Sequence, residues 1–187
     1  MVVNEKEINK ESIIAIAKNM MIAARTAPKA CGVDNLEIVM ISETSDISIL
    51  AEKMREISQN NGQKFFLRDA GNIESSQAVI FIGSKSKVQA LNCGLCGFTT
   101  CEEKNINSIS TPCVFNTHDL GLAVGSAVSM ASDFKIDNRV MYSAGVAAKE
   151  LNWLSDCFMV IAIPLSATGK NPFFDRKSTR PANCCQD

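Results

Sequence analysis

The sequence predicts a single α+β domain in which helices surround a small mixed sheet. Its 187 residues are 46% hydrophobic and 21% charged, which is the balance of a globular chain long enough to bury a core. Three aliphatic segments have the composition of buried strands, and segments with helical apolar spacing separate them. Because the chain shows no internal repeat and no linker, we expect one domain over residues 1–187.

The first half of the chain predicts two helices and two strands. In residues 7–24, apolar side chains recur at steps of three and four, which is typical of a helix. The aliphatic segment 36–41 follows as a buried strand. Residues 46–59 form the second predicted helix, with Gly62 as its stop, and residues 64–67 predict a short strand.

The second half predicts two more strands and two more helices. Residues 78–83 and 158–165 are aliphatic and read as buried strands, whereas 117–134 and 139–151 have helical spacing. The longer of these helices carries small residues four positions apart: Gly121, Gly125 and Ser129. A stripe of small residues lets another backbone approach closely, so we expect this helix near the centre of an assembly.

Residues 91–114 form a cysteine-rich segment inserted in this pattern. Cys93, Cys96 and Cys101 have the spacing C-x2-C-x4-C, and Cys113 follows after eleven residues. An iron–sulfur cluster is held by about four thiolates, several of them from one short loop. The four cysteines are therefore candidate ligands of such a cluster.

Two other interpretations of the cysteines stay open. Structural zinc also takes four cysteines, although it more often uses two C-x-x-C knuckles, and this segment has one. Free surface thiols are the second alternative, but three in nine residues would be an oxidation hazard. Outside the segment, we expect Cys31 and Cys157 to be small buried residues and His118 to lie at the surface near a helix start.

Charge and the N-terminal sequence limit the partners that we expect. The formal net charge of −1 gives no electrostatic reason to bind nucleic acid or an anionic membrane. The first ten residues carry acidic side chains and lack the apolar run of a secretory signal, and no segment has the length of a membrane span. These features predict a cytoplasmic protein without nucleic-acid or membrane partners.

Two resemblances meet in this chain. The cysteine segment resembles that of ferredoxin-like domains, which implies a 4Fe–4S cluster. The stretches "AARTAPKACGVDNLEIVMI" (23–41) and "HDLGLAVGSAVSMASDFKID" (118–137) resemble the nitroreductase family, which implies a nitroreductase-like fold, a homodimer and FMN at its interface. The whole chain resembles a family of uncharacterised proteins that join a ferredoxin-type cysteine motif to a nitroreductase-like scaffold.

The nitroreductase resemblance also implies a set of flavin contacts. In the loop after the first helix, this chain has Lys29, Gly32 and Asp34 where that family has flavin-contacting Ser, Asn and Gln. Arg25, Lys29, Lys170 and Arg176 are the basic residues that would neutralise the FMN phosphate. The resemblance thus places a flavin near residues 25–35.

These observations lead to two functional hypotheses. In the first, Cys93, Cys96, Cys101 and Cys113 hold a 4Fe–4S cluster, and the protein transfers electrons or is a flavin-linked oxidoreductase. Its electron donor would be a redox partner protein or a small molecule. In the second, the protein is a non-catalytic module whose four cysteines hold zinc or a cluster for structural reasons, with no flavin.

Overall fold

The structure is a computed structural model that describes residues 1–174. Its helices are α1 (Glu5–Thr26), α2 (Thr44–Asn61), α3 (Phe65–Glu74), α4 (Cys101–Asn107), α5 (Val114–Asp133) and α6 (Tyr142–Glu150), with a 3₁₀ turn η1 (Ala30–Gly32). Its strands are β1 (Leu36–Ile41), β2 (Ala78–Lys85), β3 (Asp137–Asn138) and β4 (Cys157–Ser166). Within the described range, none of the helices combines the length and apolarity that crossing a membrane requires.

The four strands form one sheet in the order β1-β2-β4-β3. Each neighbouring pair is antiparallel, and the central strand β2 sets Ile80 opposite both Met40 and Ile163. The expected mixed sheet is therefore wrong in strand direction. Buried aliphatic strands arise wherever both faces are covered, so their composition does not reveal whether neighbours run parallel or antiparallel.

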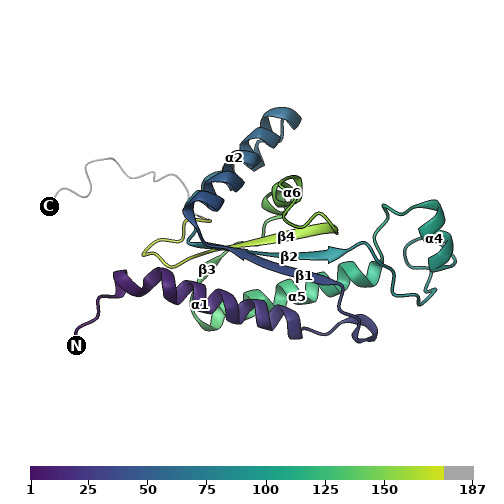
Figure 1. Cartoon of the computed structure of the whole chain (residues 1–187), viewed down its shortest axis with the longest axis horizontal. Coiled ribbons are helices and arrows are strands. Elements are labelled where there is room, and N and C mark those ends of the chain that lie inside the picture. Colours follow the sequence, from purple (N-terminus) through teal and green to yellow (C-terminus); the bar gives the residue numbers. More distant parts are fainter. Residues whose placement is uncertain (175–187) are drawn as a thin grey trace.

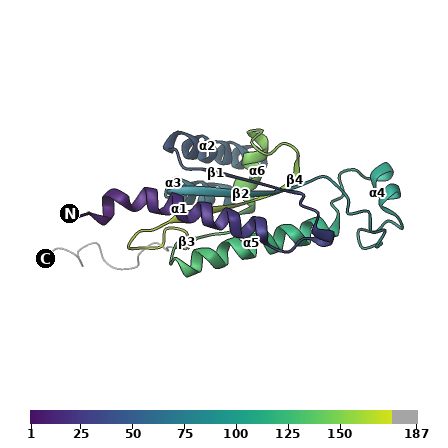
Figure 2. The ribbon, with the colours of Figure 1, turned by 60° about the horizontal axis from the view of Figure 1, so that its bottom comes forward.

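Helices cover both faces of this sheet (Figures 1 and 2). Side chains of α1 and α5 pack with Ala78, Ile80 and Ile82 on one face. Side chains of α2, α3 and α6 pack with Val79 and Phe81 on the other. Alternate residues of β2 thus enter opposite cores, as the two-residue period of a strand requires.

Three local predictions are wrong. Residues 64–67 belong to the start of α3 rather than to a strand, and Phe66 is buried against α2 and α6. Helix α5 begins after Cys113 instead of at Thr117. The helix predicted from residue 139 begins only at Tyr142, after residues 137–138 pair with β4 as strand β3.

Close backbone contact occurs at a glycine that the sequence did not single out. A β-carbon added at Gly145 of α6 would overlap the carbonyl oxygen of Val160 in β4. Gly121 and Gly125 have open space instead, and they lie on the exposed side of α5. The small-residue stripe therefore does not pack within the described chain, and its role in an assembly stays a prediction.

Residues 86–113, here called the cysteine lobe, leave the sheet at the end of β2 and return at the start of α5. The lobe consists of loops and the short helix α4. Figures 1 and 2 both show it extending beyond the end of the sheet, away from the N-terminus. The candidate ligands thus lie on a projection whose root is the first turn of α5.

Candidate functional site

The cysteine lobe carries the four candidate ligands at different depths. Cys93 is exposed, and Cys96 and Cys101 are half-buried. Cys113 is only 6% exposed and is the N-cap residue of α5. The lobe loop is tied to α4 by Asn92, whose side-chain oxygen accepts a hydrogen bond from the Cys101 N–H at 2.8 Å.

Two glycines allow the loop between these cysteines to turn. Gly94 and Gly97 both have positive φ, 72° and 89°, a conformation that glycine adopts without steric cost. Within residues 1–174, no three Cys, His, Asp or Glu side chains are grouped closely enough to hold a metal ion. Chemically, four thiols are the donor set of an iron–sulfur cluster or a zinc ion. The set of cysteines that binds a metal centre together therefore stays a prediction.

The donor set of the lobe decides which centre would fit there. Lys104 of α4 is nearly buried, at 2% exposed. Its ammonium is not among the buried side-chain atoms that lack a hydrogen-bond partner, which within the described residues are Gln89 Oε1 and Ser166 Oγ. The four thiols carried by one lobe are therefore the feature that fits a thiolate-bound centre.

The root of the lobe is held by a buried amide cluster that sequence reasoning missed. The side-chain oxygen of Asn116 on α5 accepts hydrogen bonds from Gln89 at 2.8 Å and Asn35 at 3.3 Å. Its amide nitrogen donates to the Lys87 carbonyl at 2.6 Å. Asn116 lies three residues after Cys113, so this cluster positions the candidate ligand against the sheet. Isolated Asn and Gln residues carry no periodic signal that could have revealed it.

The predicted flavin loop meets the same end of α5. Asp119 is 4% exposed, and both its carboxylate oxygens accept the backbone N–H of Ala30 in η1 at 3.1 Å. Along the axis of α5, Asp119 is about 9 Å from Cys113. The loop after α1 and the root of the cysteine lobe are therefore neighbours, although they are distant in the sequence.

Arg25 and Asp34, two of the predicted flavin contacts, bind each other. The Arg25 guanidinium lies 2.6 Å from the Asp34 carboxylate and also donates to the Leu36 carbonyl at 2.9 Å. Partial burial acts to raise the pKa of Asp34, but the Arg25 hydrogen bond, the Leu36 N–H and the charges of Arg25 and Lys29 outweigh it, so the pKa is lowered. A phosphate would have to compete with Asp34 for Arg25.

Lys29 and Gly32 are engaged in the local structure of the loop. The Lys29 ammonium donates to the carbonyls of Arg25 and Ala27 at 2.5 and 2.8 Å, which neutralises the C-terminal end of α1. Gly32 has φ 67° and provides the turn into β1. The loop therefore turns at Gly32, and its lysine is directed at the protein backbone.

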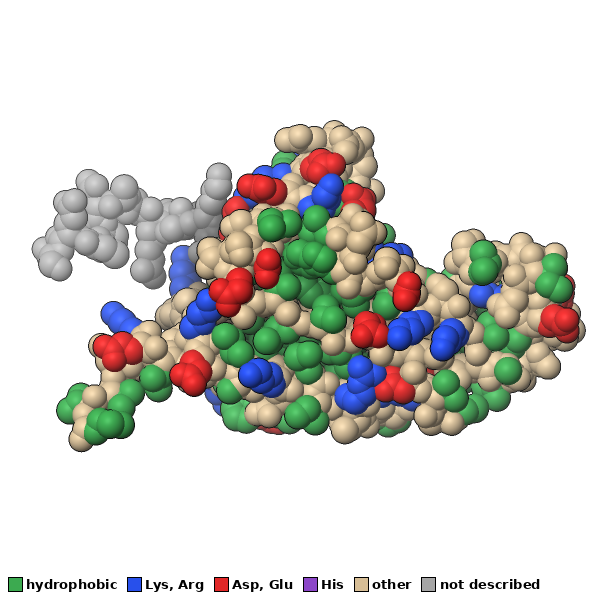
Figure 3. Space-filling view, viewed as in Figure 1, with side chains coloured by type: hydrophobic (Ala, Val, Ile, Leu, Met, Phe, Trp, Pro, Cys, Tyr) green, Lys and Arg blue, Asp and Glu red, His purple; other side chains and the backbone are tan. Residues whose placement is uncertain are grey.

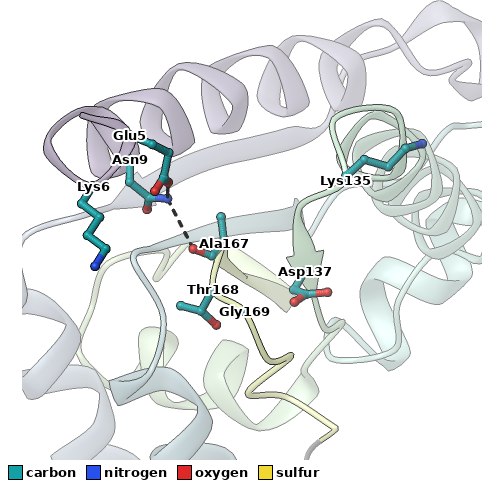
Figure 4. Close-up of a pocket in the computed structure, with 8 residues that line it drawn as sticks. All are labelled: Glu5, Lys6, Asn9, Lys135, Asp137, Ala167, Thr168 and Gly169. Atoms are coloured by element: carbon teal, nitrogen blue, oxygen red, sulfur yellow. Dashed lines mark hydrogen bonds between the residues drawn. The ribbon is translucent and has the colours of Figure 1, made fainter. Parts of the chain in front are cut away.

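Lys170 lies far from Arg25 and Lys29. It follows Gly169, which lines a cavity of about 570 Å³ at the N-terminal end of α1 (Figure 4). Arg25 is at the other end of this helix, whose 22 residues span about 33 Å. The structure therefore does not bring the predicted phosphate contacts together within one protomer. Arg176 lies outside the described residues.

The cavity beside α1 has mixed charge and no cysteine. Its lining residues are Glu5, Lys6, Asn9, Lys135, Asp137, Ala167, Thr168 and Gly169. Figure 4 shows Lys6 and Lys135 on opposite sides of it, and Asn9 donates to Glu5 at 2.6 Å. Two acids balance the two lysines, so the cavity has no net preference for an anion such as a phosphate.

The remaining singled-out residues divide between core and surface. Cys157 is buried as expected, and burial raises the pKa of its thiol to about 11, with a contribution from Glu37. Cys31 was expected to be buried but is exposed, because it occupies a left-handed turn with φ 55° that directs it away from both cores. His118 is exposed in the first turns of α5, as predicted.

Solved structures with this arrangement of helices and sheet are nitroreductase-like flavoproteins. A nitroreductase with bound FMN from Bacteroides fragilis matches 92% of this chain and 86% of its own, with a TM-score of 0.56 and 10% identity. A BluB-like flavoprotein from Clostridium difficile matches 97% and 87%, with a TM-score of 0.56 and 16% identity. The fold is therefore nitroreductase-like.

The sequence comparisons define the family more narrowly. Residues 110–176 match the family described as uncharacterized protein containing a ferredoxin domain (DUF2148). An uncharacterized protein from Archaeoglobus fulgidus is 41% identical over 183 residues, which cover 94% of this chain and 98% of that protein. The chain belongs to this ferredoxin-domain family, which confirms the family resemblance. The matched residues begin after Cys93, Cys96 and Cys101, so the cysteine motif stays a prediction.

Proposed function

We propose that the protein is a cytoplasmic iron–sulfur redox protein in which Cys93, Cys96, Cys101 and Cys113 hold a 4Fe–4S cluster. The observation that carries the proposal is the cysteine lobe itself: four thiols on one projection, three of them in the segment 93–101 and the fourth, Cys113, at its root. A cluster bound there would accept and return single electrons. The ferredoxin domain in the description of the family supports the same assignment.

The lobe gives such a centre access to a redox partner. Leu95, between two candidate ligands, is 63% exposed, and Ile106 and Ile109 of the lobe are 76% and 75% exposed. Figure 3 shows hydrophobic and acidic side chains on the surface of this projection. A partner protein or a small-molecule donor could therefore approach the thiols without any rearrangement of the sheet.

A flavin near residues 25–35 would complete a flavin-linked oxidoreductase. The contact between Asp119 and Ala30 supports this arrangement, because it holds the loop beside the root of the lobe. The structurally similar nitroreductase from Bacteroides fragilis has FMN bound, which makes FMN the flavin to test. Electrons would then pass between the flavin and the thiolate centre across the first turns of α5.

This flavin site requires a second copy of the chain. Arg25 and Lys170 lie near opposite ends of α1, farther apart than the length of one FMN molecule, so a homodimer would have to unite them. The outer surface of α1 and α5 suits an interface, since Ile22 of α1 and Leu122 of α5 are exposed and the space around Gly121 and Gly125 is open. Light scattering should give twice the 20.3 kDa of one chain, and Gly125→Leu should reduce that mass. A wild-type mass equal to that of one chain at all concentrations would contradict the dimer.

Anaerobic purification followed by absorption spectroscopy and assays of iron, sulfide, zinc and FMN tests the cofactor assignment. We expect about four iron and four sulfide per chain, the content of one 4Fe–4S cluster. Four bound thiolates with zinc and no iron would instead establish the structural-site alternative. Protein that neither carries FMN nor quenches its fluorescence would exclude the flavin while leaving the cluster in place.

Single substitutions test the ligand set. Each of Cys93→Ala, Cys96→Ala, Cys101→Ala and Cys113→Ala should lose most of the iron, because an open coordination position exposes the cluster to solvent. Cys157→Ala is the matched control, since this thiol is buried in the core away from the lobe. Cys184 and Cys185 lie outside the described residues, and we expect their alanine variants to retain iron. Full iron in Cys113→Ala combined with loss in Cys184→Ala or Cys185→Ala would place the fourth ligand in the tail.

A further inference from the structure

Strand β1 is an open edge of the sheet. Within the described residues, the strand order places β1 at one end of the sheet and the two-residue strand β3 at the other. Proteins usually protect a sheet edge by keeping it short or by placing lysine or proline on it. Residues 38–41 of β1 are all apolar and include no proline. Of the two edges, β1 is therefore the one able to accept another strand.

The hydrogen bonds to β2 show which backbone groups of β1 face outward. Leu36 lies opposite Ser84 in the antiparallel register, so the next pair along is Asn35 and Lys85. The Lys85 N–H donates to the Asn35 carbonyl at 2.9 Å. Because successive residues of a strand direct their N–H and C=O groups to opposite sides, the odd-numbered residues of β1 bond to β2. The even-numbered residues direct these groups away from the sheet.

The outward row of β1 is closed at one end and open beyond it. The Leu36 N–H donates to Asp34 at 3.1 Å, and the Leu36 carbonyl accepts from Arg25 at 2.9 Å. Within residues 1–174, the outward groups of Ile38 and Met40 have no hydrogen-bond partner in the chain. Two N–H groups and two carbonyls are thus available to an added strand.

Apolar side chains border this open row on both faces of the sheet. Ile38 and Met40 are partly buried against the core beside α1, and Val39 against the core beside α2. Val39 and Trp153 together line two hollows of about 280 and 300 Å³ next to the strand. Figure 3 shows hydrophobic side chains gathered between α1 and α2, where Figure 1 draws β1. An added strand would cover this surface.

The charges around the two hollows favour a basic occupant. The charged residues that line them are Glu37, Asp46, Lys85 and Asp156. Glu37 and Lys85 pair at 2.8 Å, whereas within the described chain Asp46 and Asp156 form no ion pair. A second copy of this edge would bring the same acids, and like charges across an interface repel. A segment of another protein that carries lysine or arginine complements them.

We propose that the β1 edge is a peptide-binding groove for an extended segment of a partner protein in which basic and aliphatic residues alternate. The backbone of the segment would pair with Ile38 and Met40. Because side chains of a strand alternate between faces, the basic ones would lie over Trp153 and the acids, and the aliphatic ones on the α1 side. The groove involves neither the cysteine lobe nor a flavin, so this function is separate from the electron transfer proposed above.

Fluorescence of the full-length protein tests the groove. Trp153 is the single tryptophan of the chain, so its emission reports an occupant of the two hollows. The probe is an end-capped hexapeptide of alternating lysine and valine, titrated at low ionic strength, where charge pairing is strongest. Two matched peptides are the controls: one has glutamate in place of lysine, and the other is N-methylated and cannot donate backbone hydrogen bonds.

Two variants test the residues of the groove. Met40→Pro removes one outward N–H without touching the bonds to β2, a position at which an edge strand tolerates proline. Asp46→Asn removes one acid at similar volume, and Asp133→Asn, at the exposed end of α5, is its control. Circular dichroism checks that each variant is folded. If Met40→Pro does not fold, the N-methylated peptide still tests the backbone pairing.

We expect the lysine–valine peptide to change the Trp153 emission saturably. The glutamate and N-methylated peptides should bind wild type at least tenfold more weakly, and folded Met40→Pro should bind the lysine–valine peptide at least tenfold more weakly. Asp46→Asn should lose about threefold in affinity, as an exposed charge contact does, and Asp133→Asn should match wild type.

Two results would overturn the inference. Equal affinity for the lysine–valine and N-methylated peptides would show that the backbone of β1 does not pair with the ligand. A wild-type Kd weaker than about 1 mM for the lysine–valine peptide would show that the edge does not take up an extended basic segment. That second result includes the case in which another copy, or another part of the chain, already covers β1.

Discussion

The two sides of the sheet and the cysteine lobe distribute polar and apolar side chains in opposite ways. Around the sheet, aliphatic and aromatic side chains such as Ile80 and Phe81 are fully buried between helices. In the lobe, Leu95, Ile106 and Ile109 are exposed while Lys104 is buried. Apolar side chains around the sheet are thus covered by helices of the same chain, whereas those of the lobe face solvent.

The lobe is nevertheless attached firmly to the sheet. Asn116 joins three chain segments through hydrogen bonds, and Asp119 fixes the loop at Ala30. Both residues belong to the first turns of α5, close to the start of the family match over residues 110–176. The two regions therefore differ in how their apolar side chains are covered, while hydrogen bonds hold the root of the lobe in place.

The largest expected effect on stability is in the core, where α6 packs against β4. Gly145→Ala should lower the free energy of unfolding by about 3 kcal/mol, the upper end of overpacking costs, because the added carbon overlaps the backbone of Val160. Gly71→Ala is the matched control, since Gly71 lies in a helix with open space around it. Urea unfolding followed by circular dichroism measures both. Equal stability of Gly145→Ala and wild type would mean that α6 and β4 are not in backbone contact.

Breaking the hydrogen-bond cluster at the root of the lobe should have the next largest effect on stability. Asn116→Ala leaves the amides of Gln89 and Asn35 without their shared acceptor, which should cost about 2 kcal/mol. It should also speed limited proteolysis within residues 86–113, while cleavage elsewhere stays unchanged. An unaltered digestion pattern would show that the lobe is held independently of this cluster.

The buried thiol of the core should make stability depend on alkaline pH. The pKa of Cys157 rises from an ordinary 9.0 to about 11, so the folded state favours the neutral thiol. Its contribution is complete below pH 9 and is lost as the pH rises towards 11. Wild type should therefore lose about 1 kcal/mol more than Cys157→Ala between about pH 8 and pH 10. Parallel stability profiles for the two proteins would contradict the raised pKa.

The smallest effect is expected at the exposed ion pair of the flavin loop. Asp34→Asn should cost about 0.5 kcal/mol near neutral pH, because half-exposed pairs are screened by water. Since the pKa of Asp34 is lowered, this contribution is present above pH 3.8 and disappears as the pH falls further. The same variant frees Arg25, so FMN affinity should rise if that guanidinium binds the phosphate. Unchanged FMN affinity would show that Arg25 does not bind the FMN phosphate.

Much of the fold and of the candidate site could be predicted from the periodicity and spacing of residues along the chain. Strand β1 has the predicted bounds, and helices α1, α2, α5 and α6 and strands β2 and β4 lie within a few residues of their predicted positions. The spacing of Cys93, Cys96 and Cys101 is itself the motif, so it is visible without a structure. Periodicity and spacing are properties of consecutive residues, which is why the sequence alone determined them.

Tertiary structure decided which elements meet. The antiparallel order of the strands, the contact at Gly145 and the hydrogen bond from Ala30 to Asp119 each join residues that are distant in the chain. Lys104 reads in the sequence as an ordinary surface lysine beside two glutamates, and only folding buries it. Local sequence records which side chains favour burial, whereas the partner that each one finds depends on how distant segments pack.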